Sequence, residues 1–587
     1  MHIPRVLLYC HAKAIRAVIV VLTCTSLLLT LRLSTSQPKQ PSIYDNTEGR
    51  TSPWHDWRHP NKTSRPEEVA FLEYLVHTYG LTNEVPWYAR RIKSSSSARR
   101  RMSMTEVPIQ FMPHDFTRAR VDDENLELRA EKSIKLPVTS SPRGHQVDAT
   151  ALLFGISTTY SRLIYANNSL ISDWERWLTD GNGNSNGASL LVTLHRARND
   201  EVERASSLLR SLGIDATVLR SVDDGDATSR YVELVHLLRE YSEGFGGGEG
   251  AQSKRYLALV DDDVFFPSMS KLVDKLSKFH PSKEYYIGAP SDRSDWIVEN
   301  NKTFTCGGGA VFLTLPMAEK FSQLPCLDLD GRDPESSTAK SAQWDFSLYD
   351  CVTSHSSAVL QVLPSYHAPG DDEAYGDRTI SSEGYGAGIR PLTLHHYKNW
   401  HRFEAGKGHL VTSACGEDCF LQRFRFRDDW ILVNGYAISH YPDGVDALPL
   451  RSRVKTPPEP PVAAATTTTR RAAAAVVAMP RKTDAPSQKQ RHDQEDGDRV
   501  AVGSGLVVDR PDRPSDMKVV AWRGRKRVWR LLDARVGEGG EVWQAYVKRR
   551  GGGNWFGDAD PRLTGDKVHA EEEKSDVDSV IVLIWEA

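Results

Sequence analysis

The sequence predicts an α/β fold, in which a mostly parallel β-sheet is covered by helices on both faces. Between residues 151 and 260, short apolar runs typical of buried strands alternate with helical segments of ten or more residues, and this alternation is typical of parallel sheets. The last run ends directly in three aspartates, at the edge where open α/β sheets bind ligands. The pattern continues to about Asp443 and predicts one large domain, residues 151–443, in a chain of 587 residues.

The individual elements follow from local periodicity. Aliphatic and β-branched runs predict strands, and apolar residues at helical spacing predict helices. The predicted strands are 151–155, 189–194, 216–219, 256–260 and 285–288, and the predicted helices are 162–178, 200–212, 231–241 and 271–279.

The strand at 256–260 delivers Asp261, Asp262 and Asp263 to one spot. Since side chains alternate faces along a strand, we expect Asp261 and Asp263 to point the same way unless the chain turns between them. Oxygen ligands of this kind suit Mg²⁺ or Mn²⁺, and a cation held there could neutralise a diphosphate. The alternative is an ordinary acidic loop at the end of a strand.

Three consecutive glycines, Gly307, Gly308 and Gly309, precede the apolar run at 311–315. Glycines in this position predict a close approach of the backbone to another group. Exposed amides there could meet a phosphate or a sugar, although a plain turn would have the same composition.

Two further motifs carry groups that could take part in chemistry. Asp371 and Asp372 form a second acidic site, and one of these carboxylates could be a general base. His395 and His396 are adjacent imidazoles, one of which could ligate a metal beside the aspartates. A pair of surface histidines is the alternative.

The N-terminus predicts a membrane segment at residues 17–33. This stretch contains an apolar run with basic residues before and after it, which favours a signal anchor with residues 1–16 in the cytoplasm and the rest of the chain in the lumen. The run is shorter than the ~20 residues of an average spanning helix, so a cleaved signal peptide is the alternative.

Acceptor triplets for N-glycosylation agree with a luminal chain. They begin at Asn61, Asn167 and Asn301, and such triplets are used in the secretory pathway. The sequence therefore places the large domain in an oxidising compartment.

Five of the seven cysteines follow the predicted anchor, which is compatible with disulfides. Cys415 and Cys419 could form a local bridge or ligate zinc, and the bridge is favoured because no second pair at finger-like spacing is present. Cys326 and Cys351 are the second expected pair, which leaves Cys306 free.

The composition outside the large domain predicts appendages. Residues 34–150 are rich in Pro, Ser and Arg and are interpreted as a stem, with one helix from Val69 to Tyr79. Residues 444–515, rich in Pro, Ala and Thr and then polar, are interpreted as a linker, and 516–587 as a small β-rich accessory module. Tryptophans of that module could line a carbohydrate platform or form its core.

The formal net charge is -3, so the overall balance gives no indication of a nucleic-acid partner.

The order of these motifs resembles the Fringe-like branch of the inverting β1,3-glycosyltransferase superfamily, in particular its fungal secretory members. The resemblance covers roughly residues 151–443 and is carried by 152–156, 260–264, 306–310, 370–373 with Gly376, 391–396, and 415–419 leading into 426–436. The sequence departs from animal Fringe around 343–351 and in its added tail.

The resemblance implies a single-pass type II Golgi membrane protein with a Rossmann-like nucleotide-diphosphate-sugar fold of the GT-A type. It implies transfer of a hexose or N-acetylhexosamine from a UDP-sugar donor, with inversion and Mn²⁺ (or Mg²⁺), to a hydroxyl of a glycan or glycoprotein. The linkage implied is β1,3.

The resemblance also assigns roles to residues at the strand end. Asp261 and Asp262, with the three glycines, would face the donor nucleotide. Asp263, together with Asp261, would ligate the metal, and His395 or His396 would supply a further protein ligand.

The same resemblance implies that Asp372 is the catalytic base, with Asp371 as the alternative one position away. Two other classes of function remain open at this point. One is a non-catalytic glycan-binding or scaffold protein with the same fold, and the other is a metal-dependent hydrolase of phosphate esters. The second acidic site argues against the former, and the glycines and the predicted anchor argue against the latter.

Overall fold

The computed structural model of the protein describes residues that all belong to one compact unit, Thr51–Ala587. These residues are 66–142, 147–222, 225–242, 254–289, 307–327, 344–363, 380–381, 388, 390–395, 397, 403–449, 499–502, 506–509, 518–522, 525–552 and 576–586. Within these ranges, no helix is both long and apolar enough to span a membrane. The predicted anchor, Asn61 and Asn301 lie outside the described residues, whereas Asn167 lies in a helix.

A nine-stranded sheet forms the predicted α/β domain, in the strand order β17-β18-β11-β9-β10-β8-β5-β6-β7. Its strands are β5 (Leu152–Thr158), β6 (Ser189–Leu194), β7 (Ala216–Arg220), β8 (Tyr256–Val260), β9 (Tyr286–Ala289), β10 (Gly307–Thr314), β11 (Leu360–Val362), β17 (Arg499–Val502) and β18 (Leu506–Asp509). Neighbours from β8 to β7 are parallel, whereas β10 runs antiparallel between β8 and β9. The prediction of an α/β fold with a mostly parallel sheet is confirmed.

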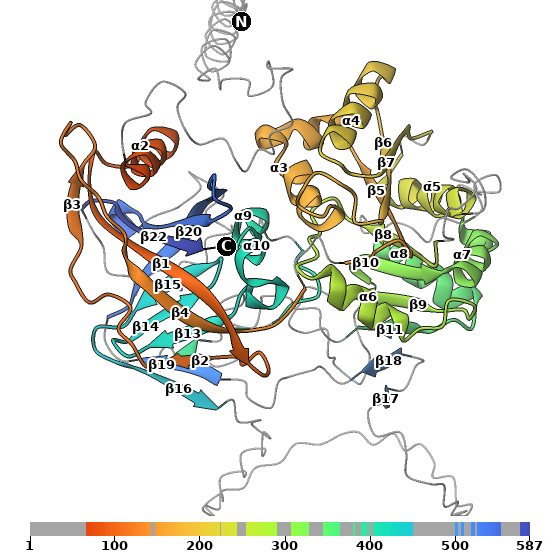
Figure 1. Ribbon diagram of the computed structural model, residues 1–587. Helices are drawn as coiled ribbons and strands as arrows, with labels where there is room; N and C mark the ends of the chain where they lie inside the picture. The colour runs from red at the N-terminus through yellow and green to blue at the C-terminus, as the bar shows by residue number, and fades with distance from the viewer. Residues whose placement is uncertain are drawn as a thin grey trace, which may run out of the picture. The chain divides into compact units, whose positions relative to one another are not determined.

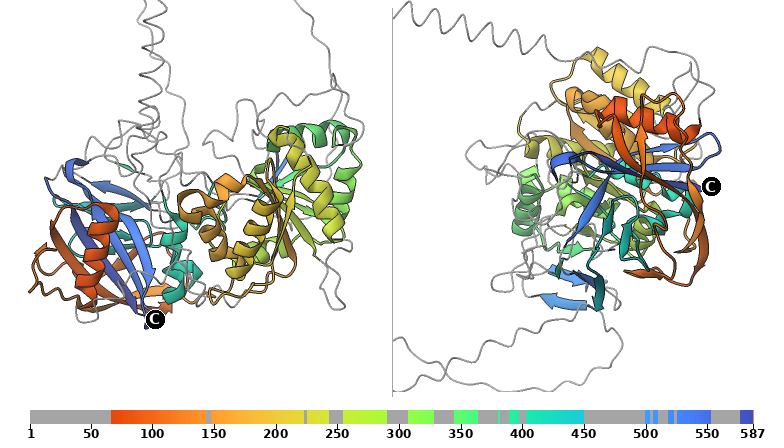
Figure 2. Two further views of the ribbon diagram at one scale, coloured as in Figure 1. Left: turned by 90° about the horizontal axis from the view of Figure 1, so that it is seen from above. Right: turned by 90° about the vertical axis from the view of Figure 1, so that its left-hand side faces the viewer.

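Helices cover both faces of this sheet (Figures 1 and 2). Phe154 of β5 packs in one core with α3 (Tyr160–Leu178), α4 (Asn199–Ser211) and α6 (Met269–Ser277), whereas the next residue back, Leu153, packs in a second core. That second core contains α5 (Ala227–Glu240), α7 (Leu315–Ser322) and α8 (Trp344–His355). The alternation of side chains along buried strands produces these two cores.

Two helices of the α/β domain begin at residues whose side chains cap them. The side chain of Thr159 accepts a hydrogen bond from the backbone N–H of Arg162, and Ser268 caps α6 in the same way. Such caps satisfy backbone donors that the first turn leaves open. Both capped helices start beside the edge of the sheet that carries the aspartates.

A second, ten-stranded sheet has the order β2-β13-β14-β15-β20-β21-β22-β1-β3, with β4 also paired to β1. Its strands are β1 (Glu84–Ala98), β2 (Thr105–Val107), β3 (Thr117–Arg120), β4 (Glu131–Thr139), β13 (Arg423–Phe426), β14 (Trp430–Val433), β15 (Ala437–His440), β20 (Arg527–Val536), β21 (Val542–Lys548) and β22 (Ser579–Glu586). Helix α2 (Glu67–Tyr79) packs on one face, as Figure 1 shows. A further sheet joins β12 (Ile380–Ser381), β19 (Lys518–Trp522) and β16 (Val445–Pro449).

This second sheet corrects the predicted domain boundaries. Its β1 lies in the predicted stem and pairs in parallel with β22 of the predicted accessory module, with Trp87 opposite Val580. Its β13 to β15 come from within 151–443, and β15 pairs with β20. The described part of 34–150 is therefore not a stem, and 516–587 is not a separate module. Likewise, β17 and β18 lie in the predicted linker and extend the nine-stranded sheet.

The composition of residues 34–150 suggested a stem, although strands in this range pair with other strands and carry buried polar side chains. Arg90 in β1 is buried, and its guanidinium donates to the carbonyl oxygens of Gln110 and Phe111. The described tryptophans of the C-terminal strands, Trp522, Trp529, Trp543 and Trp585, are buried. They form core and not a carbohydrate platform.

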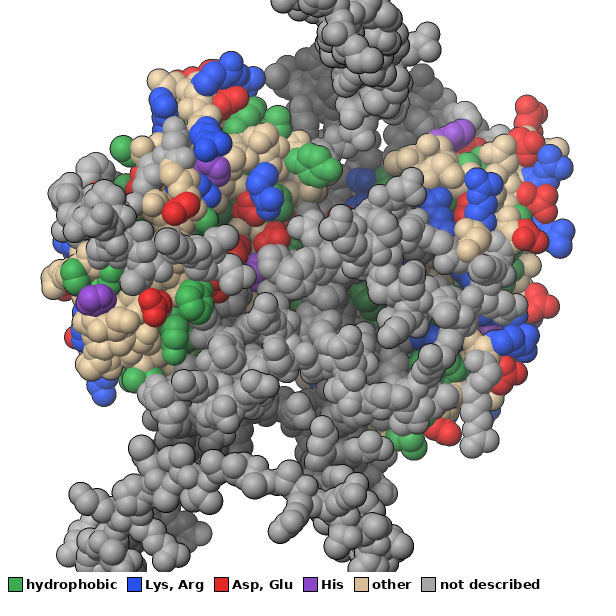
Figure 3. Space-filling view, turned by 180° about the vertical axis from the view of Figure 1, so that it is seen from behind, with side chains coloured by type: hydrophobic (Ala, Val, Ile, Leu, Met, Phe, Trp, Pro, Cys, Tyr) green, Lys and Arg blue, Asp and Glu red, His purple; other side chains and the backbone are tan. Residues whose placement is uncertain are grey.

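Charged side chains of both signs occur together on one face of the molecule. Figure 3 shows Lys and Arg interspersed with Asp and Glu on the face that it presents. The mixture of signs on this face agrees with the small formal net charge of -3.

Candidate metal centre

Asp261, Asp263 and His395 converge at the carboxyl end of β8. Their ligand atoms all lie within 4.8 Å of one another. The Nε2 of His395 is 3.2 Å from Oδ2 of Asp261 and 3.4 Å from Oδ1 of Asp263. The expectation that Asp261 and Asp263 share one side is met, whereas His396 lies outside the described residues.

Backbone pairing places His395 at this position. Leu394 and Phe265 form an antiparallel bridge, in which the two backbone N···O distances are 2.8 and 2.9 Å. Because Phe265 follows Asp263 by two residues and Leu394 precedes His395 by one, this bridge brings the aspartate and the imidazole together. No local signal in the sequence predicts this pairing.

Gly309 leaves room for the imidazole. Its φ is +76°, and a Cβ at this position would lie 2.5 Å from Cε1 of His395. Its carbonyl oxygen accepts a hydrogen bond of 2.8 Å from the backbone N–H of Asp261. The close backbone approach expected at the glycines is therefore explained at Gly309 by contact with His395, and Gly307 and Gly308 lie in β10.

Asp262 points away from the other two aspartates. Its carboxylate accepts hydrogen bonds of 2.6 and 2.5 Å from the Arg162 guanidinium and one of 2.5 Å from the Thr158 hydroxyl. Burial raises the pKa of the Asp262 carboxyl, and the Arg162 and Thr158 hydrogen bonds oppose this change. The hydrogen bond to Asp262 in turn raises the pKa of Arg162, whose side chain is 53% exposed.

Two aromatic residues orient Asp261. The indole Nε1 of Trp344 donates a hydrogen bond of 2.6 Å to Oδ1, and the Tyr231 hydroxyl lies 3.1 Å from the same oxygen and 2.9 Å from the Val260 carbonyl. The two rings are stacked, with centroids 4.0 Å apart. Burial raises the pKa of Tyr231 well above its usual value, so the hydroxyl stays protonated. Oδ1 is therefore engaged with the protein, and Oδ2 faces His395.

Trp344 lies in α8 and Tyr231 in α5. No sequence pattern indicated that either residue contacts Asp261. Trp344 is the first residue of α8, and Asp345 follows it with a half-buried side chain whose Oδ1 accepts from the Phe346 N–H. Asp345 is thus a carboxylate in the first turn of the helix that begins with Trp344. Asp371 and Asp372 lie outside the described residues.

The donor set fits a divalent cation. Two carboxylates and one imidazole suit Mn²⁺, and the two carboxylates also suit Mg²⁺. The absence of a Cβ at Gly309 permits the imidazole to reach the aspartates, and the hydrogen bonds to Asp261 supply the outer support that metal ligands commonly have.

Replacing Trp344 with Phe should weaken Mn²⁺ binding about 10-fold. Phe keeps an aromatic ring against Tyr231 but has no N–H for Oδ1 of Asp261, so that oxygen loses its shorter hydrogen bond and keeps only the one from the Tyr231 hydroxyl. The measurement is a titration of the protein with Mn²⁺ followed by electron paramagnetic resonance of the free ion. Equal affinity in wild type and Trp344→Phe would show that the indole does not orient the ligand.

Disulfides join Cys326 to Cys351 and Cys415 to Cys419, which are the two pairs expected from the sequence. Cys351 lies in α8, so the first bond ties the helix that begins at Trp344 to the residues after α7. In the second pair both sulfur atoms are used in the bond, which leaves no thiolate for zinc.

Comparisons with known proteins give no family assignment. No protein-family model matches the chain, and no curated protein sequence matches it significantly. Among solved structures, inositol-1-phosphate CTP transferase from T. maritima is 14% identical over 36% of this chain and 84% of its own, with a TM-score of 0.23.

Two glycosyltransferase structures are similar at the same level. A mannosyltransferase from Pyrobaculum calidifontis, in complex with GDP-Man and Mn²⁺, is 11% identical over 32% of this chain and 50% of its own, with a TM-score of 0.21. The glycosyltransferase GlyE of Streptococcus pneumoniae is 11% identical over 44% of this chain and 56% of its own, with a TM-score of 0.25. TM-scores of this size do not establish a shared fold, and the function proposed below rests on the residues of this chain.

Proposed function

We propose that the protein is an inverting glycosyltransferase of the GT-A type that uses Mn²⁺ or Mg²⁺. It moves a hexose or N-acetylhexosamine from a UDP-sugar to a hydroxyl of a glycan or glycoprotein, in a β1,3 linkage. The observation that carries this proposal is the convergence of Asp261, Asp263 and His395 at the carboxyl end of β8. A cation site at this edge of a mostly parallel sheet suits a diphosphate ligand. The Fringe-like order of the motifs supports the finer assignment.

Asp261, Asp263 and His395 would hold the cation, which when bound stabilises the negative charge that develops on the diphosphate leaving group. Trp344 fixes the orientation of Asp261. Arg162 pairs with Asp262, so the middle carboxylate adds no unpaired negative charge beside the donor. Each of these contacts is made before substrate binds, which lowers the reorganisation needed during the reaction.

Inversion requires a base on the face of the sugar opposite the diphosphate. As the acceptor oxygen attacks the anomeric carbon and the bond to the diphosphate breaks, the acceptor proton passes to a carboxylate. Asp372, or Asp371 beside it, is the base that the resemblance implies. Asp345 is a second candidate, because it directly follows the tryptophan that donates to Asp261.

Release of UDP from a panel of UDP-sugars by the unit Thr51–Ala587 tests the proposal, with and without Mn²⁺ and glycan acceptors. We expect Mn²⁺-dependent turnover of one donor. Asp345, Asp371 and Asp372 are each replaced by Asn. The variant that removes the catalytic base should lose roughly 100-fold or more in turnover and keep its affinity for UDP. The variants of the other two positions serve as matched controls.

The alternative of a glycan-binding protein makes a different prediction in the same experiment. Such a protein would bind glycans with Asp345, Asp371 or Asp372 replaced and would turn over no donor. Absence of both turnover and UDP binding in the presence of Mn²⁺ would contradict the glycosyltransferase proposal.

We also propose a luminal location in the Golgi as a single-pass type II membrane protein, on the basis of the basic and apolar pattern of residues 1–33. Sensitivity of the expressed protein to an N-glycosidase, with loss of the shift when Asn61, Asn167 and Asn301 are all replaced by Gln, would support it. An unglycosylated protein in the soluble fraction would contradict it.

A further inference from the structure

One short loop contacts both segments that carry the candidate metal ligands. We call residues 415–419, closed by the Cys415–Cys419 bond, the disulfide loop. The Asp263 arm is the segment 263–270, which leads into α6, and the His395 arm is 390–395. The two arms already touch each other through the bridge between Phe265 and Leu394.

Glu417 ties the disulfide loop to the Asp263 arm. Its carboxylate, which is buried, accepts a hydrogen bond of 2.6 Å from the Ser268 hydroxyl and another from the Ser270 hydroxyl. Ser268 is the cap of α6 and follows Asp263 by five residues. The contact therefore fixes the end of the arm that begins at a candidate ligand.

Asp418, the next residue, ties the same loop to the His395 arm. Its carboxylate forms an ion pair with Arg390, which precedes His395 by five residues. Arg101 reinforces this side, because it donates to the carbonyl oxygens of Asp418, at 2.7 Å, and Gly388, at 3.1 Å. Two consecutive carboxylates thus hold the two arms.

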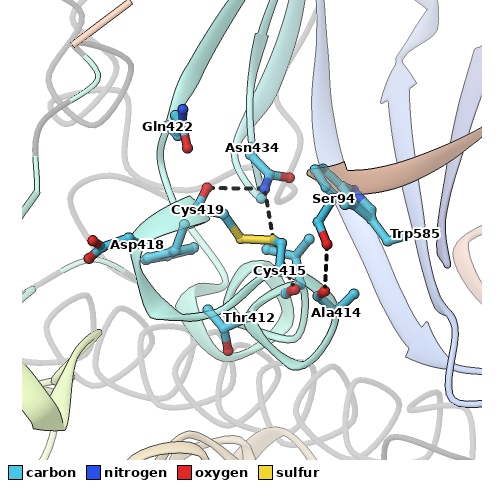
Figure 4. The surroundings of a disulfide bond; sticks show 12 residues. Ser94, Thr412, Ala414, Cys415, Asp418, Cys419, Gln422, Asn434 and Trp585 are labelled. Carbon is cyan, nitrogen blue, oxygen red and sulfur yellow. Dashed lines mark hydrogen bonds between the residues drawn. A yellow bond between two sulfur atoms is a disulfide. The ribbon is translucent and has the colours of Figure 1, made fainter. Parts of the chain in front are cut away.

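The disulfide loop is itself held firmly. Gly416 has a φ of +83°, the Glu417 N–H donates to the Pro142 carbonyl, and the Asp418 N–H donates to the Ser141 hydroxyl at 3.0 Å. Figure 4 shows Asn434 directed at the disulfide, where its Nδ2 donates to the Cys419 carbonyl at 3.0 Å, while the Asp418 carboxylate points away from the disulfide. These contacts restrict the motion of the loop against the ten-stranded sheet.

We infer that Glu417 and Asp418 are positioning residues that set the separation of the Asp263 and His395 arms. This inference rests on the proposed function. The three ligands come from two segments far apart in sequence, so their spacing depends on how those segments are tied together. Ligands that outer contacts hold in place bind metal more tightly than ligands that must first be ordered. The ten-stranded sheet therefore contributes to the site through one loop.

The test measures Mn²⁺ affinity and melting temperature of the full chain in detergent. Glu417→Ala and Asp418→Ala should each weaken Mn²⁺ binding about 10-fold. Glu417→Gln keeps an oxygen that accepts from the serine hydroxyls and should retain affinity close to that of wild type. This rescue by the conservative variant separates positioning from a need for charge.

Asp428→Ala is the matched control. The Asp428 carboxylate accepts hydrogen bonds from the backbone N–H groups of Phe111 and Met112, and neither of these residues lies in an arm. We expect this variant to lower the melting temperature and to leave Mn²⁺ affinity unchanged. An equal loss of affinity in Asp428→Ala would overturn the inference, because general destabilisation would then explain the effect.

The remaining outcomes distinguish failure of this inference from failure of the proposed function. If wild type binds Mn²⁺ and neither alanine variant weakens it, this inference is wrong and the proposed function stands. If wild type binds no Mn²⁺, the proposed function fails and the inference fails with it. Should Glu417→Ala or Asp418→Ala not fold, Ser270→Ala and Arg390→Ala break the same ties from the other side and should weaken Mn²⁺ binding as well.

Discussion

Asp263→Asn is expected to weaken Mn²⁺ binding by about 100-fold and to reduce UDP-sugar turnover to background. The side chain of Asp263 is buried beside Asp261 and His395, and Asn keeps its shape while removing the charge that a cation needs. The melting temperature without metal should not fall, because the substitution removes repulsion between two neighbouring carboxylates. Calorimetric titration with Mn²⁺ and a thermal melt give the two values.

Asp274→Asn serves as the control for this variant. Asp274 lies on the exposed side of α6, so its substitution makes the same change in charge outside the site. Affinity and turnover should be those of wild type. Turnover by Asp263→Asn within a few-fold of wild type would contradict a role for Asp263 as a metal ligand.

Removing β22, by ending the chain after Asp578, is expected to abolish the cooperative folding of the protein. β22 lies between β21 and β1 in the ten-stranded sheet, and Val580 to Trp585 are fully buried. Burial of each large apolar side chain contributes about 1.5–3 kcal/mol. The sum is comparable with the whole stability of a typical domain, about 5–15 kcal/mol. Circular dichroism and limited proteolysis should therefore report an unfolded or partly folded chain.

The ten-stranded sheet also predicts the effect of a truncation at the N-terminal end of the chain. A fragment that starts at Ala151 lacks β1 and α2, so β22 would lose its parallel partner. This fragment should aggregate, whereas Thr51–Ala587 should melt cooperatively. Removal of Ala587 alone is the control for the C-terminal truncation. A sharp, unshifted melt of the chain that ends at Asp578 would show that the sheet does not depend on β22.

The part of the fold that the sequence predicts is the part with local signals. β5 to β8 and helices α3 to α6 follow from apolar runs and helical periodicity, and each lies close to its predicted range. The aspartates could be predicted as a cation site because they directly end a buried strand and alternate faces. His395 could be proposed only as one of two adjacent candidate ligands, since its place beside the aspartates depends on the non-local bridge between Leu394 and Phe265.

The ten-stranded sheet could not be predicted because its pairing is non-local. Trp87 pairs with Val580, although the two residues are far apart in sequence. No pattern within either strand indicates which strand it pairs with. Arg90 lies in the Arg-rich segment interpreted as a stem, yet its guanidinium is buried and donates to the backbone carbonyls of Gln110 and Phe111. The contacts of Trp344 and Tyr231 with Asp261 are non-local in the same way.

The most direct test of the central claim is a titration of Thr51–Ala587 with UDP in the presence and absence of Mn²⁺, for wild type and Asp263→Asn. The account predicts that wild type binds UDP only with Mn²⁺ and that the variant loses this Mn²⁺-dependent binding. Binding of UDP that is equal with and without Mn²⁺, or equal in wild type and Asp263→Asn, would contradict a nucleotide-diphosphate site built on Asp261, Asp263 and His395.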